Sequence, residues 1–425
     1  MIYLAVAAVC GGLLLLALWG RPRLALVVWL LSITMLPIWI SVHFLIAIPV
    51  HCIVAVIAAT ATVFHTSLKG TLLDVYFGLF MAVCVLAMSS NAISAHSVLI
   101  IIIQWGIPFL AARVLVSATG IRYAVDAVAL IFGLVGALAV LELLADWHPF
   151  VSWSLGSATG FQIWGPIQYR GGVVRSEWAF GHSIALGASL AMAIPFIVRS
   201  SFSGRVRGAL LIAAGAGAFA SASRIGIVAT VLTAGICLVN AESMRRLRVL
   251  LVVSVGAGFL LAYEFLLPAV QRWAAGESRG DQLSAQYRGQ LYADFLPRIE
   301  WLSPYDLYAR GENAVTSMDS AVLDIGLRFG WLALGLAAFP FALAVFRTLM
   351  ARASAAEIAL VGQIPVLATV ALITQYQNLL FVVAAIAVQQ LSETQAMTAA
   401  SEISNSQFRE DDAPAPSLRP TSIGR

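Results

Sequence analysis

Arg224 is the residue of this chain that most suggests chemistry, because it interrupts a long apolar stretch. The stretch runs from Val206 to Val239, and as one helix it would be about 50 Å long, whereas the hydrocarbon core of a bilayer is ~30 Å thick. A break at Ser223 and Arg224 gives two short helices whose shared tip lies below the outer interface. We therefore expect Arg224 in a recessed pocket, where an ionised group marks a functional site. The alternative is an arginine that reaches from a helix end to the interface.

Arg175 and His182 lie where a polar loop enters an apolar segment that begins at Ser183. A helix N-terminus at this point disfavours the protonated imidazole, so His182 is a candidate proton acceptor or phosphate ligand. A histidine that only caps the helix is the alternative. Glu177 lies between the two residues and can orient either. The loop also carries aromatic residues that predict an interfacial belt or, less simply, a platform on which sugars stack: Trp147, Trp153, Trp164 and Trp178.

A second polar loop contains Arg288 and Arg310 and ends at Asp319, at the mouth of another apolar segment. Arg288 lies beside a stripe of apolar residues that recur every four positions, which predicts an amphipathic helix on the outer membrane surface; the stripe is formed by Leu283, Tyr287, Leu291 and Phe295. Asp324 and Arg328 follow at i and i+4, a spacing that favours an ion pair on one helix face.

The composition indicates that membrane helices position these residues. Of 425 residues, 60% are hydrophobic and only 11% are charged, whereas soluble chains carry about 25% charged residues. The apolar residues form blocks long enough for membrane helices. Thirteen spans are predicted, the last of them short: Tyr3–Leu18, Leu24–Ile40, Phe44–Phe64, Leu72–Met88, Val98–Val116, Tyr123–Leu144, Ser183–Val198, Gly208–Ala222, Ile225–Val239, Val249–Leu267, Ala321–Phe346, Ile358–Thr374 and Leu379–Leu391. No basic region precedes the first block, which favours a retained span over a cleaved signal peptide.

Basic residues fall in alternate loops, as expected when cytoplasmic loops collect lysine and arginine. This pattern predicts an N-terminus outside and a C-terminus in the cytoplasm. The loops on the outer side comprise short, nearly uncharged turns, among them Gln375–Asn378, and two long segments, 146–182 and 268–320. The long segments hold seven arginines and no lysine: Arg170, Arg175, Arg272, Arg279, Arg288, Arg298 and Arg310. Forked guanidinium groups suit two-point contact with phosphate or diphosphate oxygens; a general preference for arginine over lysine is the alternative.

Several classes of function are excluded by missing motifs. The four cysteines lie in separate apolar blocks, and no Cys or His spacing predicts a metal site. We find no nucleotide-binding glycine loop, and no cytoplasmic loop is long enough to fold as a nucleotide-using domain. No cofactor, metal or nucleic-acid partner is therefore expected. The chain divides into a transmembrane domain, residues 1–391, and a polar tail, residues 392–425, which is predicted to be disordered in the cytoplasm.

Taken together, four segments between Arg170 and Leu391 resemble the superfamily of O-antigen ligases and Wzy-type polysaccharide polymerases. The first is Arg175-x-x-x-x-Phe-Gly-His182-x-x-x-x-Gly187, and the second is the Ser-x-Ser-Arg224 turn. The third is Tyr287-Arg288-x-x-Leu-Tyr292 followed by Ile299, Pro304 and Gly311. The fourth is Asp319-Ser320-x-x-Leu323 with Gly326 and Gly330. Asp319 stands where the family has its loop histidine, and Glu177-Trp178 replaces a family glycine.

The resemblance implies an all-α integral membrane protein of 12–13 transmembrane helices, GT-C-like, with short amphipathic helices in its two long periplasmic or extracellular loops. It implies metal-independent, inverting glycosyl transfer on the outer face of the cytoplasmic (inner) membrane, from a glycan on undecaprenyl diphosphate to an acceptor hydroxyl. The diphosphate would be held by Arg175, Arg224, Arg288 and Arg310. Arg224 and Arg288 would stabilise the charge of the leaving group, and Asp319 or His182 would take the proton.

Our leading hypothesis is a polymerase of lipid-linked repeat units in exopolysaccharide biosynthesis at the cell envelope. An O-antigen ligase that transfers the glycan to lipid A-core is the nearest alternative. A secondary transporter or flippase, and a non-enzymatic member of a polysaccharide-assembly complex, are alternatives from other classes. The expected partners are membrane lipid, the lipid-linked glycan and polysaccharide-assembly proteins.

Overall fold

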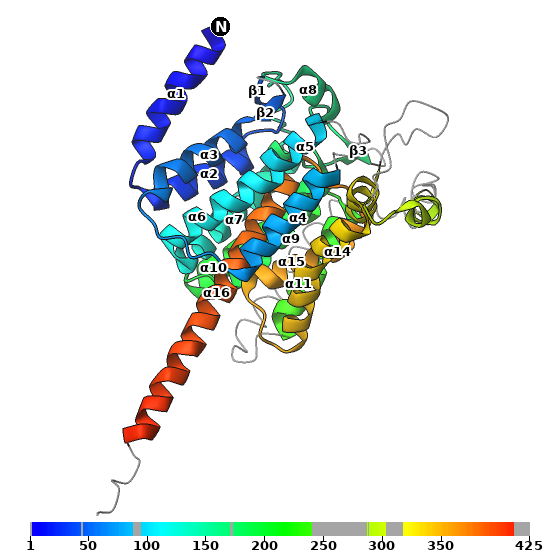
Figure 1. The fold of residues 1–425 in the computed structure, drawn as a ribbon. Helices are drawn as coiled ribbons and strands as arrows, with labels where there is room; N and C mark the ends of the chain where they lie inside the picture. Colours follow the sequence, from blue (N-terminus) through cyan, green and yellow to red (C-terminus); the bar gives the residue numbers. More distant parts are fainter. Residues whose placement is uncertain are drawn as a thin grey trace, which may run out of the picture.

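The computed structural model describes residues 2–43, 46–87, 95–170, 173–239, 287, 289–302 and 318–411, and these are mostly helical (Figure 1). The helices of the first half are α1 (Ile2–Leu18), α2 (Pro22–Met35), α3 (Val50–Val63), α4 (Leu72–Leu86), α5 (Ala95–Ile101), α6 (Ile107–Thr119), α7 (Ile121–Ala145) and α8 (Ala158–Trp164). Those of the second half are α9 (Ser183–Arg199), α10 (Gly204–Ala220), α11 (Arg224–Val239), α14 (Ala321–Leu349), α15 (Ala355–Thr369) and α16 (Thr374–Asp411). Short helical turns lie at Ile102–Gly106, Trp178–Phe180 and Leu296–Arg298, and residues 289–295 are also helical.

Two small antiparallel ribbons join the helices at one end of the protein. β1 (Ser41–His43) pairs with β2 (Ala47–Pro49), and β3 (Tyr169–Arg170) pairs with β4 (Val173–Val174). The first ribbon lies where the sequence predicts the end of one span and the start of the next. Pro37 and Pro49 explain the difference, since proline lacks the amide N–H of a helix and disfavours helical geometry in the residue before it.

Three helical stretches in the described residues are long and apolar enough to cross a membrane: Val98–Thr119, Ile121–Ala145 and Ala321–Leu349. Seven more apolar helices are shorter, with 10–17 residues. Each predicted span within the described residues overlaps a helix, and the predicted span Val249–Leu267 lies outside them. The predicted all-α class is thus confirmed, whereas the total of 12–13 crossings and the orientation of the termini stay predictions.

Helix α9 lies at the centre of the bundle. Its residues from Ser183 to Val198 are buried with the exception of Ile184, and it packs against α7, α10, α11, α15 and α16. Alanine and glycine are frequent on α9, and small residues let helix backbones approach closely without a hydrophobic driving force from water. These contacts hold both ends of α9 in place. The N-terminal end of α9 belongs to the motif that runs from Arg175 to Gly187.

The break predicted at Arg224 is confirmed. Helix α10 has 17 residues and ends at Ala220, and α11 has 16 residues and begins at Arg224. Ser221 closes α10 by donating its hydroxyl to the Ala218 carbonyl at 2.7 Å, and Ala222 adopts the left-handed conformation with φ 48°. The chain reverses within this three-residue turn.

The predicted turn at Gln375–Asn378 is wrong, because these residues form the start of α16 and are buried. Their amides bond with neighbouring helices instead of water. Asn378 donates to the Gln104 carbonyl at 2.8 Å and its Oδ1 lies 3.0 Å from His51 Nε2. Gln377 accepts from the Trp105 indole at 3.0 Å. Interhelical partners satisfy polar groups that a hydropathy pattern assigns to a loop.

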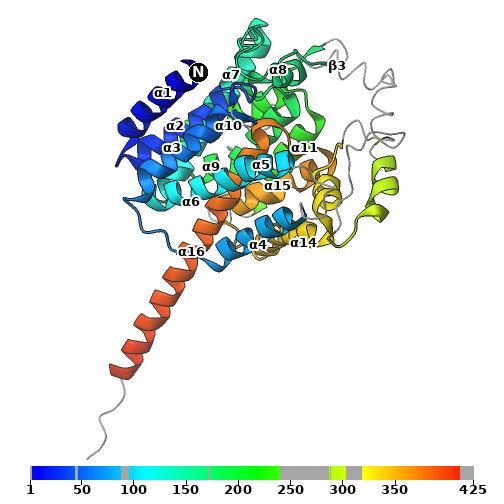
Figure 2. The same ribbon diagram turned by 45° about the horizontal axis from the view of Figure 1, so that its top comes forward.

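Helix α16 continues to Asp411, well into the segment 392–425 that the sequence predicts to be disordered. Figures 1 and 2 both show its distal half projecting away from the bundle. Alanine, glutamine and glutamate, which are good helix formers, are frequent there and explain the helix. Residues 412–425 lie outside the described residues.

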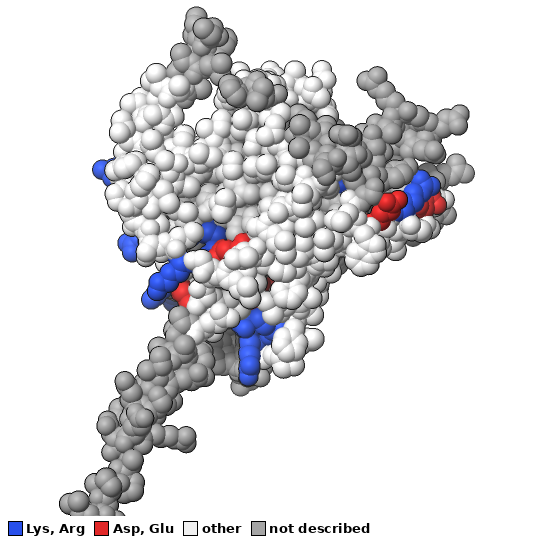
Figure 3. All heavy atoms as spheres, viewed as in Figure 1, with Lys and Arg blue, Asp and Glu red and all other residues white. Residues whose placement is uncertain are grey.

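Among the described residues, charged side chains are confined to small areas of the face shown in Figure 3. Blue side chains gather at the end where α16 leaves the bundle, and a second mixed group lies beside the segment 289–302. Where α16 leaves the bundle, an ion pair between the buried Arg113 and the partly exposed Asp74 joins α6 to α4. Arg113, 1% exposed, holds Asp74 through two bonds of 2.7 and 2.8 Å and also donates to Gln389 of α16.

Candidate functional site

The start of α9 carries the first predicted site residue, His182. Its Nδ1 accepts a hydrogen bond from the backbone N–H of Ile184 at 3.1 Å, so the side chain caps the helix. Its ring meets that of Trp164 edge to face, with centroids 5.8 Å apart. Burial, reinforced by the positive charge of Arg175, lowers the pKa of His182 to about 4. The imidazole is therefore neutral at physiological pH, and the capping interpretation is the one seen in the structure.

Arg175 connects the first loop to the turn that carries Arg224. Its side chain is buried, and its Nε donates to the carbonyl oxygen of Ser221 at 3.2 Å. The next residue, Ser176, donates its backbone N–H to Ala220 at 3.2 Å. Two segments more than 40 positions apart in the sequence are thereby held together at the end of α10.

Gly187 and Gly226 permit the close contact between α9 and this turn. A Cβ atom added to Gly187 would lie 2.7 Å from the Ser221 hydroxyl oxygen and 3.3 Å from the Cα of Gly226. One added to Gly226 would lie 3.0 Å from the Cα of Gly187. The glycine of the first motif therefore lies directly on the second motif.

Arg224 is the first residue of α11 and its side chain is exposed. The Ser223 hydroxyl accepts from the backbone N–H of Gly226 at 3.2 Å and so holds the start of the helix. The structure thus places Arg224 on the same short turn whose carbonyl Arg175 contacts. The depth of this turn in a membrane stays a prediction.

The second loop is described only in part, and Arg288 and Arg310 lie outside the described residues. The amphipathic stripe is described from Tyr287 onward. It packs on the start of α14, with Leu291 buried in a cluster that includes Leu323 and Leu327. Protein contacts, and not only a membrane surface, therefore cover this stripe.

The third and fourth motifs also meet. A Cβ atom on Gly326 would lie 2.6 Å from the side chain of Ile299, and one on Gly330 would lie 2.4 Å from the carbonyl oxygen of Trp301. Gly330 has φ 82°, a conformation that favours glycine. The end of the second loop therefore lies tightly on the first turns of α14.

Asp319 is half-buried and immediately precedes the start of α14. Its neighbour Ser320 caps that helix by accepting from the N–H of Leu323 at 3.3 Å, and lies 2.8 Å from the hydroxyl of Tyr292. The predicted ion pair on the same helix is confirmed, with Asp324 and Arg328 2.8 Å apart.

The two halves of the site lie at one end of the bundle. Gln375 of α16 donates to the carbonyl oxygen of Ala179, in the first loop, at 2.7 Å. A few residues earlier in the chain, the carbonyl oxygen of Val370 accepts from the N–H of Ala321 at 2.9 Å. The α15–α16 connection therefore links the His182 junction to the Asp319 junction.

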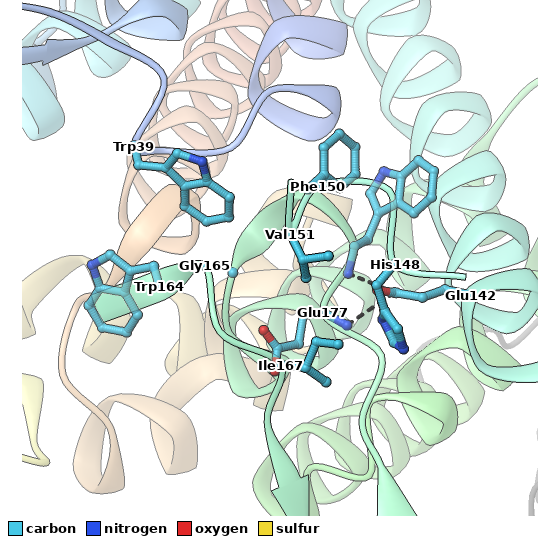
Figure 4. A pocket seen from close by; sticks show the side chains of 11 residues that line it. Trp39, Glu142, His148, Phe150, Val151, Trp164, Gly165, Ile167 and Glu177 are labelled. Carbon is cyan, nitrogen blue, oxygen red and sulfur yellow. Dashed lines mark hydrogen bonds and ion pairs between the residues drawn. The ribbon is translucent and has the colours of Figure 1, made fainter. Parts of the chain in front are cut away.

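Sequence reasoning missed a pocket beside the first loop. It is a small cavity of about 20 Å³ between the end of α7 and the segment 164–181, which is room for about one water molecule. Most of its lining residues are aromatic, acidic or histidine: Trp39, Glu142, His148, Phe150, Val151, Trp164, Gly165, Ile167, Glu177, Trp178 and Gly181. Figure 4 shows Trp39 and Trp164 on one side, Glu142 and His148 on the other, and Glu177 between them.

Glu142 organises the polar side of the pocket. One carboxylate oxygen accepts from the backbone N–H groups of Glu177 and Trp178, at 3.1 and 2.7 Å, and the other lies 3.0 Å from Nδ1 of His148. The opposite ring nitrogen of His148 lies 3.3 Å from Asp146. The signal available in the sequence was weak, because Glu142 is one of two acidic residues, with Asp126, in a mostly apolar helical segment, and its partners follow at no motif spacing.

Glu177 is the second buried carboxyl of the pocket. Its Oε1 accepts from the backbone N–H of Gln168 at 2.9 Å. Burial raises the pKa of Glu177 to about 8; the nearby negative charge of Glu142 adds to the rise, and the Gln168 N–H and Arg175 oppose it. A carboxyl group that titrates near neutral pH in a pocket is suited to exchange protons with a ligand.

The described residues hold no cluster of three or more His, Cys, Asp or Glu side chains that would bind a metal ion. The arrangement offers a cation, a neutral imidazole and two buried carboxyl groups at one end of the bundle. Comparison with known proteins adds no relative: no protein family, no curated protein and no solved structure matches the chain.

Proposed function

We propose that the chain is an integral membrane glycosyltransferase that polymerises undecaprenyl-diphosphate-linked oligosaccharide repeat units into a surface polysaccharide. The reaction would take place on the outer face of the cytoplasmic membrane and require no metal or nucleotide. The donor's anomeric carbon would pass to a hydroxyl of the second glycan, and the lipid diphosphate would leave.

The contact of Arg175 with the Ser221–Arg224 turn is the observation that carries this proposal. Segments that resemble two motifs of one enzyme family meet there through a 3.2 Å hydrogen bond and a glycine contact. The two remaining motifs meet in the same way at the start of α14, through Ile299 and Gly326. Contacts within each of these two pairs of segments, among the described residues, support the proposal of a common site.

The residue types suit the chemistry. Departure of a lipid diphosphate develops negative charge, and arginine stays protonated even where water is scarce. Arg224 is exposed at the start of α11 and is therefore accessible to such a group, while Arg175 is buried and donates to the Ser221 carbonyl of the adjoining turn. Arg288 and Arg310 are the further proposed ligands of the diphosphate, and Asp319 and His182 the candidate bases from sequence.

The test is the glycan profile of a host in which the gene is replaced by variants. Arg224→Ala and Arg175→Ala should abolish long-chain glycan, while the single repeat unit accumulates on the lipid. Arg298→Ala is the matched control, because it removes an exposed arginine of the second loop that lies against the ring of Phe295, 4.9 Å from its centre. Unchanged chain length in the Arg224 and Arg175 variants, with protein levels equal to wild type, would refute the assignment. Loss of glycan attachment to lipid A-core with normal chain length would point to the ligase alternative.

A further inference from the structure

Two carboxyl groups, those of Glu142 and Glu177, share the cavity beside α7, and we call them the carboxyl pair. Both side chains are buried, and both line the same small space (Figure 4). One oxygen of Glu142 accepts from the backbone N–H of Glu177 itself, at 3.1 Å. The space of about 20 Å³ has room for about one water molecule. Because so little water reaches the carboxyl pair, two negative charges there are strongly disfavoured.

A buried donor without a protein partner lines the same cavity. Trp178 is 6% exposed, and its indole N–H has no hydrogen-bond partner among the described residues. The one water that the cavity admits would accept from this N–H and donate to a carboxylate oxygen, which relieves the cost of an unpaired donor. A single water does not replace bulk solvent, so a second negative charge in the cavity stays costly.

Hydrogen bonds indicate which member of the carboxyl pair holds a proton. Bonds to a carboxylate favour its charged form, and Glu142 receives two from backbone N–H groups, at 3.1 and 2.7 Å. Glu177 receives one such bond among the described residues, from the N–H of Gln168 at 2.9 Å. Burial, with the nearby charge of Glu142, raises the pKa of Glu177 to about 8. The proton of the carboxyl pair is therefore assigned to Glu177.

The other titratable and charged groups around the cavity come from α7, from the segment that follows α7 and from the first loop. They are Glu142, Asp146, His148, Arg175 and His182. Arg175 opposes the rise in the pKa of Glu177, but its Nε is bonded to the Ser221 carbonyl. The remaining lining residues are aromatic, aliphatic or glycine.

The backbone on either side of Glu177 fastens the first loop to the bundle and to the α10–α11 turn. Four consecutive N–H groups, those of residues 175–178, all donate hydrogen bonds; the acceptors are the carbonyl oxygens of Gln168 and Ala220, at 3.1 and 3.2 Å, and the carboxylate of Glu142 for the last two. A charge that appears on Glu177 therefore acts on the segment that holds Arg175 against the turn.

We propose that the carboxyl pair is a proton-binding site that controls the first loop: the bound proton keeps Arg175 on the α10–α11 turn, and its release loosens residues 175–178. The consequence for catalysis rests on the proposed polymerase function, in which Arg175 is a ligand of the diphosphate. Because the first loop is predicted to face outward, the site would respond to the pH of the surrounding medium.

The direction of the response follows from proton linkage. The fastened loop keeps the proton up to about pH 8, whereas a loosened loop, with Glu177 in water, releases it near the ordinary carboxyl pKa of 4.5. Loosening therefore releases a proton between these two values and becomes more favourable as pH rises through them. Above about pH 8 neither state holds the proton, so the response levels off.

Hydrogen exchange of the purified full-length protein tests the site without relying on activity. The reporters are the four bonded amides of residues 175–178. After correction for the intrinsic rate, their exchange in the wild type should rise about tenfold per pH unit between about pH 5.5 and pH 7.5 and level off above about pH 8. Glu177→Gln keeps an oxygen for the Gln168 N–H but does not ionise, so its corrected rate should be constant. Asp294→Asn, the same change on an exposed residue of the second loop, should follow the wild type.

Chain growth is the second readout, with the lipid-linked repeat unit extracted from a host that lacks the gene. The wild-type rate should fall at least threefold from pH 6 to pH 8, whereas Glu177→Gln should keep its pH 6 rate; an equal fall in both would refute the control of catalysis. A change in corrected exchange of less than threefold in the wild type, or the wild-type slope in Glu177→Gln, would overturn the proton site and leave the polymerase function standing. Exchange as predicted, with no chains from the folded wild type, would leave the proton site standing and overturn the polymerase function.

Discussion

The contact between Gly187 and the α10–α11 turn gives a sharp prediction about stability. We expect Gly187→Ala to destabilise the protein, because its new methyl group would lie 2.7 Å from the Ser221 hydroxyl oxygen. That oxygen is not free to move. It donates to the Ala218 carbonyl at 2.7 Å and accepts from the N–H of Ser223 at 3.3 Å.

The magnitude follows from these contacts. Displacing the hydroxyl loses two hydrogen bonds at about 1 kcal/mol each, and a methyl forced into a packed contact costs about 1–3 kcal/mol if the helices move instead. Replacement of a glycine by alanine within a helix stabilises the helix by about 0.5–1 kcal/mol. The net loss of unfolding free energy is therefore about 1–2 kcal/mol.

The assay is the midpoint of thermal unfolding in detergent, followed by tryptophan fluorescence. Gly235→Ala on α11 is the matched control, since nothing lies within 4 Å of the added atom, and its midpoint should equal or exceed that of the wild type. Ser221→Ala removes the clashing oxygen, so the double variant Gly187→Ala/Ser221→Ala should be more stable than the sum of the single losses by about 1 kcal/mol. Equal midpoints for Gly187→Ala and Gly235→Ala, or strictly additive losses, would refute the reasoning.

Three further predictions concern charge and sidedness. The folded protein binds a proton at Glu177 that the unfolded chain releases at its ordinary pKa of 4.5, so stability should fall as pH rises from about 4.5 to about 8; Glu177→Gln should flatten the pH dependence of the thermal midpoint, and an unchanged slope would contradict the raised pKa. Asp74→Asn should lower the free energy of unfolding by about 3 kcal/mol or more, because it leaves Arg113 buried without its carboxylate partner. A much smaller loss would contradict this prediction and would show that solvent reaches the Arg113 guanidinium. In a Cys10→Ser background, which removes the exposed native cysteine, Gln290→Cys should react with a membrane-impermeant maleimide from outside; reaction only after permeabilisation would overturn the topology.

Hydropathy and charge predicted the helical class and the break at Arg224 because both depend on local sequence. An arginine in the middle of an apolar stretch leaves few alternatives to a break, and the structure starts α11 at that residue. This turn also contacts Gly187, which belongs to the motif that precedes it in the sequence. Residue types and spacing were sufficient for these features.

Other features depend on partners far away in the sequence. Gln375 and Asn378 look like a polar turn, yet both are buried and bond with distant segments, Gln375 with the Leu36 carbonyl and Asn378 with the Gln104 carbonyl. The pocket brings Trp39 together with Glu142 and Glu177, from three separate segments. Periodicity within one segment carries no information about such neighbours, so Glu177 was seen only as a residue that orients Arg175 or His182, and Glu142 was missed.

Reconstitution tests the central claim most directly. The purified protein is placed in liposomes with the lipid-linked repeat unit, without nucleotide, and the products are separated by length. We predict a ladder of lipid-linked glycans that grows by whole repeat units, with release of undecaprenyl diphosphate, and no ladder from Arg224→Ala in parallel. No chain growth by the folded wild-type protein, or an identical ladder from the Arg224 variant, would contradict the account.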